Sequence, residues 1–342
     1  MNYNKIKITE NEKKMKKFLT ILLSLSILVM PILGCKKTDD DTIRLNEVTH
    51  SVFYAPLYLA IENGYFADEG LKIELTNGGG ADNSMTALLS GTADVGLMGP
   101  ETVIYVYNQN KADYPKVFGQ LTQKDGSFLV SRNAEPDFEW SDLRGKEVLA
   151  GRKGGVPAMT FEYIMNELDM ENNKDFTMNF DVQFNLMTSA FLGGTADYCT
   201  VFEPTASEYQ ASGKWHIVAS VGEQGGEIPY TSFIALGSYI KNNQDKIEKF
   251  MKALKKAYEF MDTHSEYEVA EAIVKQFPST TINSIETSIK SYKAIDAWKT
   301  DMQATEQSFN RLQDIMQNAG ELTNRVSFNK IVDNSIARQV FG

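Results

Sequence analysis

Two glutamates stand where a carboxylate could contact a ligand. Glu101 stands in Gly99-Pro100-Glu101 and Glu203 in Phe202-Glu203-Pro204, each after a predicted strand. A buried carboxylate accepts hydrogen bonds from amino groups and ring N–H donors, and it repels anions. An acid in the first turn of a helix also complements the helix dipole. For Glu101 both readings stand, and for Glu203 we favour a ligand contact.

Aromatic side chains occur in the same regions of the chain. Aromatic rings hold planar ligands through offset or edge-on packing, which contributes about 0.5–1.5 kcal/mol per pair beyond burial. Any one of them alone is better explained as a core residue. Their concentration in segments that we expect to be loops indicates a planar ligand. They are Phe53, Tyr54, Tyr105, Phe202 and Tyr230.

Two glycine-rich segments each precede a predicted helix. One spans residues 77–82 and ends at Asp82, and the other spans 151–157 and contains Arg152 and Lys153. Backbone N–H groups at a helix N-terminus, aided by a basic side chain, can hold an anionic or acceptor group. Glycine also simply permits a tight turn between strand and helix. Neither segment continues as a phosphate-binding loop.

Signals for catalysis or for a metal are weak. The three histidines, His50, His216 and His264, are far apart, and no metal-ligand spacing joins them. Cys199 is better explained as a small buried residue than as a nucleophile. We therefore expect no catalytic residue, no metal and no cofactor.

The elements that must position these residues alternate between strand and helix. Residues 42–48 and 71–75 have strand patterns, and residues 55–63 between them form an amphipathic helix. Such repeated units predict an α/β fold with a mainly parallel sheet.

An internal repeat predicts two lobes of similar construction. Residues 85–102 read MTALLSGTADVGLMGPET and residues 188–205 read TSAFLGGTADYCTVFEPT, at a constant offset of 103. Each copy parses as a helix end, a Gly cap, a short strand and a loop that opens a helix. Phe128 to Ser131 and Tyr230 to Leu236 are the strands by which the chain enters and leaves the second lobe. We assign 43–130 and 229–342 to lobe 1 and 131–228 to lobe 2, with a helical C-terminal part packed on lobe 1.

Ligands of open α/β sheets bind beyond the carboxyl ends of the strands, where loops of both lobes converge. Applied to the repeat, this rule selects the loops named above and the two crossing segments. The predicted ligand-binding residues are Ser51, Phe53, Tyr54, Asp82, Gly99, Glu101, Ser127, Gly154, Gly155, Phe202, Glu203 and Tyr230.

The N-terminal region has the pattern of an export signal. Four lysines between residues 13 and 17 precede an apolar run from Phe18 to Leu33, which ends at Gly34-Cys35. A membrane span needs about 20 apolar residues, so a cleaved signal over 1–34 is the better reading. We expect Cys35 to carry a lipid anchor and residues 35–42 to form a tether. An ordinary signal peptide cut near Gly34 is the alternative.

Charge excludes one class of partner. Residues 1–34 carry six Lys and two Glu, a net +4, so their removal takes the formal charge from −11 to −15. Such an acidic chain is unsuited to nucleic acid. We expect a monomer.

Three runs resemble one family of binding proteins. Phe53 to Ala60, together with Asn63-Gly64-Tyr65-Phe66, is similar to the opening of the binding components of ABC importers for nitrate, sulfonate, taurine and thiamine precursors. Gly91 to Gly96 and Phe202-Glu203-Pro204 match further recurring stretches of that family. The resemblance implies the type II periplasmic-binding-protein fold, with two lobes that close on a small molecule. It also implies ABC permease and ATPase partners and an extracytoplasmic, membrane-anchored location.

The resemblance leaves the ligand open. In one branch, which looks like binders of the thiamine pyrimidine precursor, a carboxylate at the position of Glu203 meets the ligand's amino group. This branch implies a planar nitrogen heterocycle. The sulfonate/taurine branch is the alternative, because residues 151–156 could hold an anion. A related branch contains enzymes that make the thiamine pyrimidine with a cysteine-rich motif and a histidine. This chain has neither, so we expect a binding protein and not an enzyme.

Overall fold

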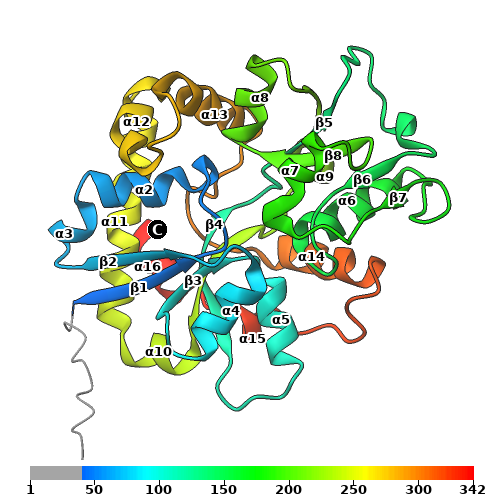
Figure 1. The fold of residues 1–342 in the computed structure, drawn as a ribbon. Helices are drawn as coiled ribbons and strands as arrows, with labels where there is room; N and C mark the ends of the chain where they lie inside the picture. Colours follow the sequence, from blue (N-terminus) through cyan, green and yellow to red (C-terminus); the bar gives the residue numbers. More distant parts are fainter. Residues whose placement is uncertain (1–40) are drawn as a thin grey trace, which may run out of the picture. The chain divides into compact units, whose positions relative to one another are not determined.

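The computed structural model describes residues 41–342, which fold into two α/β lobes (Figure 1). The expected signal peptide over 1–34, the lipid site at Cys35 and most of the tether lie outside these residues. No helix within 41–342 is long and apolar enough to cross a membrane.

Each lobe is built on a five-stranded mixed sheet. The first sheet has the order β2-β1-β3-β10-β4 and the second has the order β7-β6-β8-β5-β9. In both sheets the first three strands are parallel, and one strand, β10 or β5, runs antiparallel to its two neighbours. The first sheet contains β1 (Thr42–Glu47), β2 (Lys72–Asn77), β3 (Val95–Met98), β4 (Pro115–Thr122) and β10 (Thr231–Leu236). The second contains β5 (Ser127–Ser131), β6 (Glu147–Leu149), β7 (Thr177–Met178), β8 (Tyr198–Phe202) and β9 (His216–Ser220).

The 103-residue repeat is confirmed as a structural equivalence. In the first lobe the Asp94 carboxylate accepts a hydrogen bond of 2.9 Å from the backbone N–H of Arg44, beside the start of β3. In the second lobe Asp197 accepts the same 2.9 Å bond from the backbone N–H of Glu147, beside the start of β8. The repeated Gly-Thr-Ala-Asp turn thus tethers each repeat strand to its parallel neighbour in the same way.

Short helices connect the strands and cover the sheets. Their N-termini at the carboxyl ends of the parallel strands face the region between the lobes, as the sequence rule predicts. In lobe 1 they are η1 (Val52–Tyr54), α2 (Ala55–Glu62), α3 (Tyr65–Asp68), α4 (Ala81–Leu89) and α5 (Glu101–Tyr107). In lobe 2 they are η2 (Trp140–Leu143), α6 (Val156–Glu167), η3 (Phe184–Leu186), α7 (Met187–Leu192), α8 (Thr205–Ala211) and α9 (Val221–Gly225).

The chain crosses between the lobes at residues 123–126 and again at 226–230. The sequence boundary at residue 130 is corrected by the sheet pairing, because all of β5, from Ser127 onward, pairs with β8 and β9. A strand that follows a crossing belongs to the sheet whose hydrogen bonds it completes, so lobe 2 begins at Ser127.

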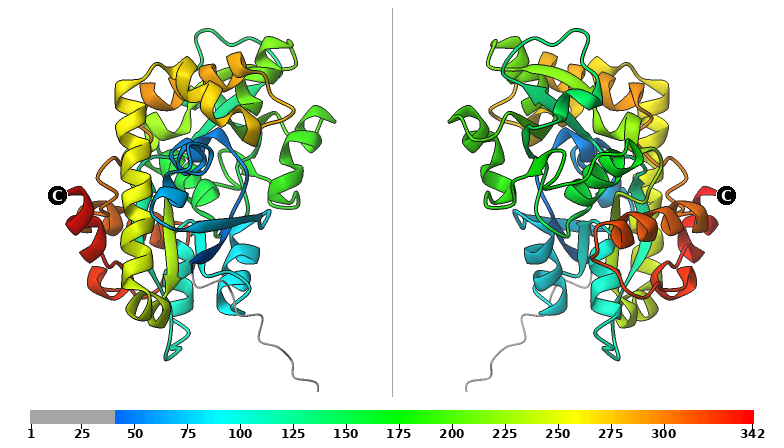
Figure 2. Two further views of the ribbon diagram at one scale, coloured as in Figure 1. Left: turned by 90° about the vertical axis from the view of Figure 1, so that its left-hand side faces the viewer. Right: turned by 90° about the vertical axis from the view of Figure 1, so that its right-hand side faces the viewer.

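The C-terminal part is helical, as expected. The long helix α11 runs the height of lobe 1 and packs on α2, α3 and α16 (Figure 2). Two helices also reach the second lobe, because α13 contacts α8 and α14 contacts α6. The C-terminal helices are α10 (Gly237–Asn242), α11 (Gln244–Thr263), α12 (Glu266–Ile273), η4 (Val274–Gln276), α13 (Ile282–Ala294), α14 (Glu306–Asn318), α15 (Phe328–Ile331) and α16 (Ser335–Phe341).

Candidate ligand pocket

A pocket of about 430 Å³ lies between the lobes, within the size range of small-molecule sites. Loops at the carboxyl ends of β1, β2 and β3 form one wall, and loops after β6, β7 and β8 form the other. Thr231, the first residue of the antiparallel strand β10, also lines the pocket. The lining residues are 48–49, 54, 79–83, 99, 101, 152, 155–157, 180–185, 202 and 230–231.

Seven of the twelve predicted ligand-binding residues line this pocket, and the other five lie behind its wall or beside it. The lining residues are Tyr54, Asp82, Gly99, Glu101, Gly155, Phe202 and Tyr230. Those outside the lining are Ser51, Phe53, Ser127, Gly154 and Glu203.

Glu101 is the buried acid of the pocket. It is the first residue of α5, its side chain is almost fully buried, and its Oε2 has no hydrogen-bond partner among the described residues. Burial raises the pKa of Glu101 to about 7, while the Arg152 guanidinium and nearby backbone N–H groups lower it. A buried acceptor without a partner is costly unless a ligand or water satisfies it. Glu101 therefore lines the pocket with an unpartnered carboxylate oxygen that is closed to solvent here, so Oε2 must turn towards the pocket before a ligand can reach it.

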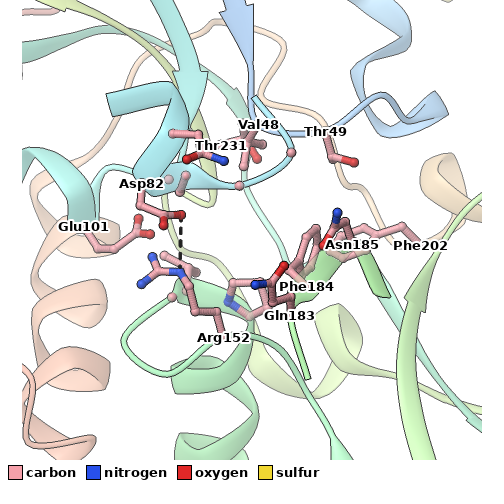
Figure 3. Close-up of a pocket in the computed structure, with 18 of the residues that line it drawn as sticks. Val48, Thr49, Asp82, Glu101, Arg152, Gln183, Phe184, Asn185, Phe202 and Thr231 are labelled. Carbon is pink, nitrogen blue, oxygen red and sulfur yellow. Dashed lines mark ion pairs between the residues drawn. The ribbon is translucent and has the colours of Figure 1, made fainter. Parts of the chain in front are cut away.

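Arg152 reaches from lobe 2 towards two carboxylates of lobe 1. Its Nε lies 3.8 Å from Oδ1 of Asp82, and the guanidinium points up between Asp82 and Glu101 (Figure 3). Arg152 is the single basic side chain among the described lining residues, whereas Asp82, Glu101 and Asp181 are acidic. The local field is therefore unfavourable to a free anion.

Aromatic rings line the lobe-2 side of the pocket. The ring of Phe184 packs edge-on against Phe202 with 6.1 Å between centroids. Behind them, Phe53 is fully buried, 5.9 Å from Phe202 and 5.8 Å from Tyr230 between centroids. Phe53 thus supports two lining rings from the core of lobe 1 and is not itself a wall residue.

Glu203 lies behind the wall, although the sequence favoured a ligand contact there. Its carboxylate accepts two hydrogen bonds from Ser207, one from Oγ at 2.6 Å and one from the backbone N–H at 2.9 Å. Its backbone N–H donates to Tyr292 and its carbonyl accepts a 2.8 Å bond from the Ser51 hydroxyl. Burial raises the pKa of Glu203, and the bonds from Ser207 offset part of that rise. In this structure the carboxylate satisfies the first turn of α8, and Ser51 joins the lobes.

Ser127 and Gly154 also serve the contacts between the lobes. Ser127 donates from its backbone N–H and its hydroxyl to the buried Asp125 carboxylate, at 2.7 and 2.6 Å, in the first crossing segment. The carbonyl of Gly154 in lobe 2 accepts a 2.9 Å hydrogen bond from the hydroxyl of Tyr105 on α5. The prediction that these two residues contact a ligand stays a prediction.

Sequence reasoning missed residues 180–185, which supply six lining positions including Phe180 and Phe184. They follow β7, which is only two residues long and therefore leaves no alternating pattern to detect. Had that strand been recognised, the rule on strand carboxyl ends would have selected this segment. Val48 and Thr49, at the end of β1, were missed although their strand was predicted correctly.

The two-lobed arrangement with its pocket is that of periplasmic binding proteins. The structure is similar to the alkanesulfonate-binding protein SsuA of Xanthomonas axonopodis pv. citri, with a TM-score of 0.69 and 16% identity, covering 86% of this chain and 98% of that one. It is also similar to the nitrate-binding protein NrtA of Synechocystis PCC 6803, with a TM-score of 0.72 and 15% identity, covering 88% of each chain. These likenesses confirm the fold.

Sequence comparison identifies the family. Residues 52–267 match the family model described as "NMT1/THI5 like". The chain is 41% identical over 314 residues to the "Putative binding protein YtlA" of Bacillus subtilis (strain 168), covering 92% of this chain and 94% of that protein. The chain belongs to the NMT1/THI5-like family, as a solute-binding protein of the kind that serves ABC import systems.

Proposed function

We propose that the protein is the extracytoplasmic, solute-binding component of an ABC importer and captures a small planar nitrogen heterocycle, such as a thiamine pyrimidine precursor. The observation that carries this proposal is the unpartnered Oε2 of Glu101 in an aromatic-lined pocket. An amino group or a ring N–H would satisfy that oxygen, while the rings of Phe184, Phe202 and Tyr54 would pack on a planar ligand.

The charge of the pocket supports a neutral or cationic ligand. Three carboxylates, Asp82, Glu101 and Asp181, face one guanidinium, Arg152. An anionic ligand would lose its hydration on entering the pocket, and the excess of carboxylates would then repel its charge. A neutral heterocycle with a donor edge avoids that penalty.

We infer binding rather than catalysis. The described lining residues include no His, Cys, Ser or Lys, which leaves the carboxylates Asp82, Glu101 and Asp181 as the candidate bases or nucleophiles. Cys199 is fully buried in β8, and burial raises the pKa of its thiol, which keeps it protonated.

The location and partners follow from the same proposal. An export signal over residues 1–34 and a lipid on Cys35 would hold the protein at the outer face of the membrane. There it would work as a monomer and deliver its ligand to permease and ATPase subunits.

A sulfonate is the second candidate ligand. Arg152 and the N-terminus of α6, where Gly155 and Val156 line the pocket, are groups that suit an anion. The protein SsuA, which shares the fold, was solved bound to MOPS. This candidate requires Arg152 to turn away from Asp82 and towards the ligand.

Thermal unfolding of the purified protein with an aminopyrimidine precursor of thiamine, taurine and an alkylsulfonate tests the proposal. A ligand at one hundred times its Kd raises stability by about 2.7 kcal/mol. We expect stabilisation by the aminopyrimidine alone. Tight binding of taurine or the alkylsulfonate, with none of the aminopyrimidine, would overturn it.

A matched pair of variants locates the binding site. Phe184→Ala removes a lining ring and should weaken binding about 5- to 30-fold, since a buried aromatic contact contributes about 1–2 kcal/mol. Leu186→Ala, two residues away, removes a side chain that is 51% exposed and lies outside the lining, and should leave affinity unchanged. Equal effects of the two changes would place the ligand elsewhere.

A further inference from the structure

The N-terminus of α6 opens into the pocket without a side-chain cap. Gly155 is the N-cap and has no side chain to accept from the first N–H groups, and Gly155, Val156 and Pro157 all line the pocket. The N–H groups of the first turn and the dipole of this twelve-residue helix favour a negative charge at that point. Arg152, three residues before the N-cap, adds a full positive charge to the same wall.

The negative charge beside this helix end is the chain's own Glu101, which comes from the other lobe. The backbone N–H of Val156 and the guanidinium of Arg152 both lower the pKa of this carboxyl, against the effect of burial. Its Oε2 is buried and unpartnered, although the residue lines the pocket. The carboxylate therefore lies in the electrostatic field of α6, and its Oε2 has no hydrogen-bond partner among the described residues.

The backbone of Gly99 leaves room for the carboxylate in this place. A Cβ added to Gly99 would collide with Oε2 of Glu101, so the carboxylate lies folded against the bare backbone of Gly99. Gly99 and Glu101 both line the pocket, and Pro100 between them is the N-cap of α5. The Gly-Pro-Glu sequence thus leaves room for one acid side chain beside the N-terminus of α6.

We propose that Glu101 is the specificity-determining residue of this pocket, a carboxylate that occupies the place at the N-terminus of α6 where an anionic ligand would otherwise bind. This inference rests on the pocket being the ligand site of the proposed function. An anion entering the closed pocket meets a buried like charge and finds the helix end already compensated. A neutral ligand instead needs an N–H donor, whose hydrogen bond Oε2 accepts once the carboxylate turns towards the pocket.

Isothermal titration at pH 8 with methanesulfonate and taurine as probes tests the inference. Wild type should bind neither probe. Glu101→Gln keeps the shape and removes the charge, and Glu101→Ser also vacates the space. We expect at least one of these variants to bind methanesulfonate with a Kd at least tenfold lower than the weakest binding that the titration could detect for wild type. Adding Arg152→Gln should remove that gain, because the remaining positive side chain is lost.

Asp181→Asn is the matched control, since it removes one pocket carboxylate without opening the end of α6. An equal gain in Asp181→Asn would show a net-charge effect and overturn the inference. So would the absence of any gain in Glu101 variants whose thermal melts show them folded. Aminopyrimidine binding by wild type is measured in parallel. If wild type binds no heterocycle but the Glu101 variants gain an anion, the proposed ligand is wrong and the role of Glu101 stands.

Discussion

Buried carboxylates in this protein divide by whether the chain itself satisfies them. Both oxygens of Glu47 are hydrogen-bonded at 2.6 Å, one by His50 and the other by the hydroxyl of Tyr58. Both oxygens of Glu203 accept from Ser207. Glu101 differs, because its Oε2 has no partner among residues 41–342 and the residue faces a pocket. The satisfied acids Glu47 and Glu203 hold loops together. Asp125 also has one oxygen, Oδ2, without a partner among those residues, but it lies outside the pocket lining, so among these buried acids Glu101 is the unsatisfied one that lines the pocket.

Glu101 should destabilise the unliganded fold at neutral pH. Burial raises the pKa of Glu101 to about 7 in the folded state. The side chain is protonated and costs nothing below about pH 4.5, and stability is lost as the pH rises from there to about 7, where the buried carboxylate becomes charged. Glu101→Gln should therefore gain on wild type over this window, by up to about 3 kcal/mol. Urea unfolding of both proteins at pH 4.5 and pH 8 measures the difference. A constant difference would mean that the carboxylate is not buried in solution.

His50 should stabilise the fold in its charged form, whereas Glu101 destabilises the fold in its charged form. Burial lowers its pKa, but the hydrogen bond and charge of Glu47 and the bond to the carbonyl of Gln276 outweigh burial and raise it. The stabilisation by His50 is then full below about pH 6.5 and is lost as the pH rises through the folded-state pKa.

The variant His50→Gln tests this assignment. It should cost about 1–3 kcal/mol at pH 5.5, because a charge-assisted bond to a buried acid is lost, and less at pH 9. Denaturant unfolding of the variant and wild type at the two pH values gives the two differences. A cost that grows with pH would show that the histidine is neutral in the fold.

At the scale of elements, the sequence predicted what local patterns encode. The turn before Asp94 and Asp197 needs Gly and Asp at fixed positions, and the same pattern appears twice, so the two lobes could be inferred. Strand β7 could not, because two residues carry no periodicity. The surroundings of Glu203 were also out of reach, since Ser207 competes for its carboxylate over one helical turn and only the fold shows which contact forms.

The packing of α9 against the first crossing segment is another contact that only the fold reveals. A Cβ on Gly222 would collide with the backbone carbonyl oxygen of Asp125, and neither backbone can yield easily. Gly222→Ala should cost about 1–3 kcal/mol through overpacking. Gly237→Ala is the control, because its Cβ would meet ordinary contacts at 3.4 and 3.5 Å, and it should change stability little. Thermal melts of the two variants decide, and equal midpoints would show that the crossing segment shifts freely.

At the scale of the whole described chain, the lobes are joined by more than the two crossing segments. Helix α14 lies on α6 of lobe 2, while α15 after it packs on β4 of lobe 1. The side-chain amide of Asn166 on α6 donates to Asn318 at 2.7 Å, and the Arg311 guanidinium lies 5.8 Å from the centroid of Tyr163. The segment from α14 to α15 therefore bridges both lobes on one side of the pocket. Opening must either break these contacts or bend the chain on both sides of α14, at residues 298–305 and at residues 319–327.

We expect opening to break them. The double variant Asn166→Ala/Arg311→Ala removes one hydrogen bond and one cation–π contact, together about 1–2 kcal/mol, and should raise the open fraction about 5- to 30-fold. Spin labels on cysteines placed at exposed Ser90 in lobe 1 and Ser212 in lobe 2, in a Cys35→Ser background, report the lobe separation without any ligand. The variant should shift the distance distribution to longer values. Gln307→Ala, on the exposed face of α14, should leave it unchanged. Identical distributions in all three proteins would show that α14 travels with lobe 2, and that the lobes open by bending on both sides of α14, at residues 298–305 and 319–327, instead.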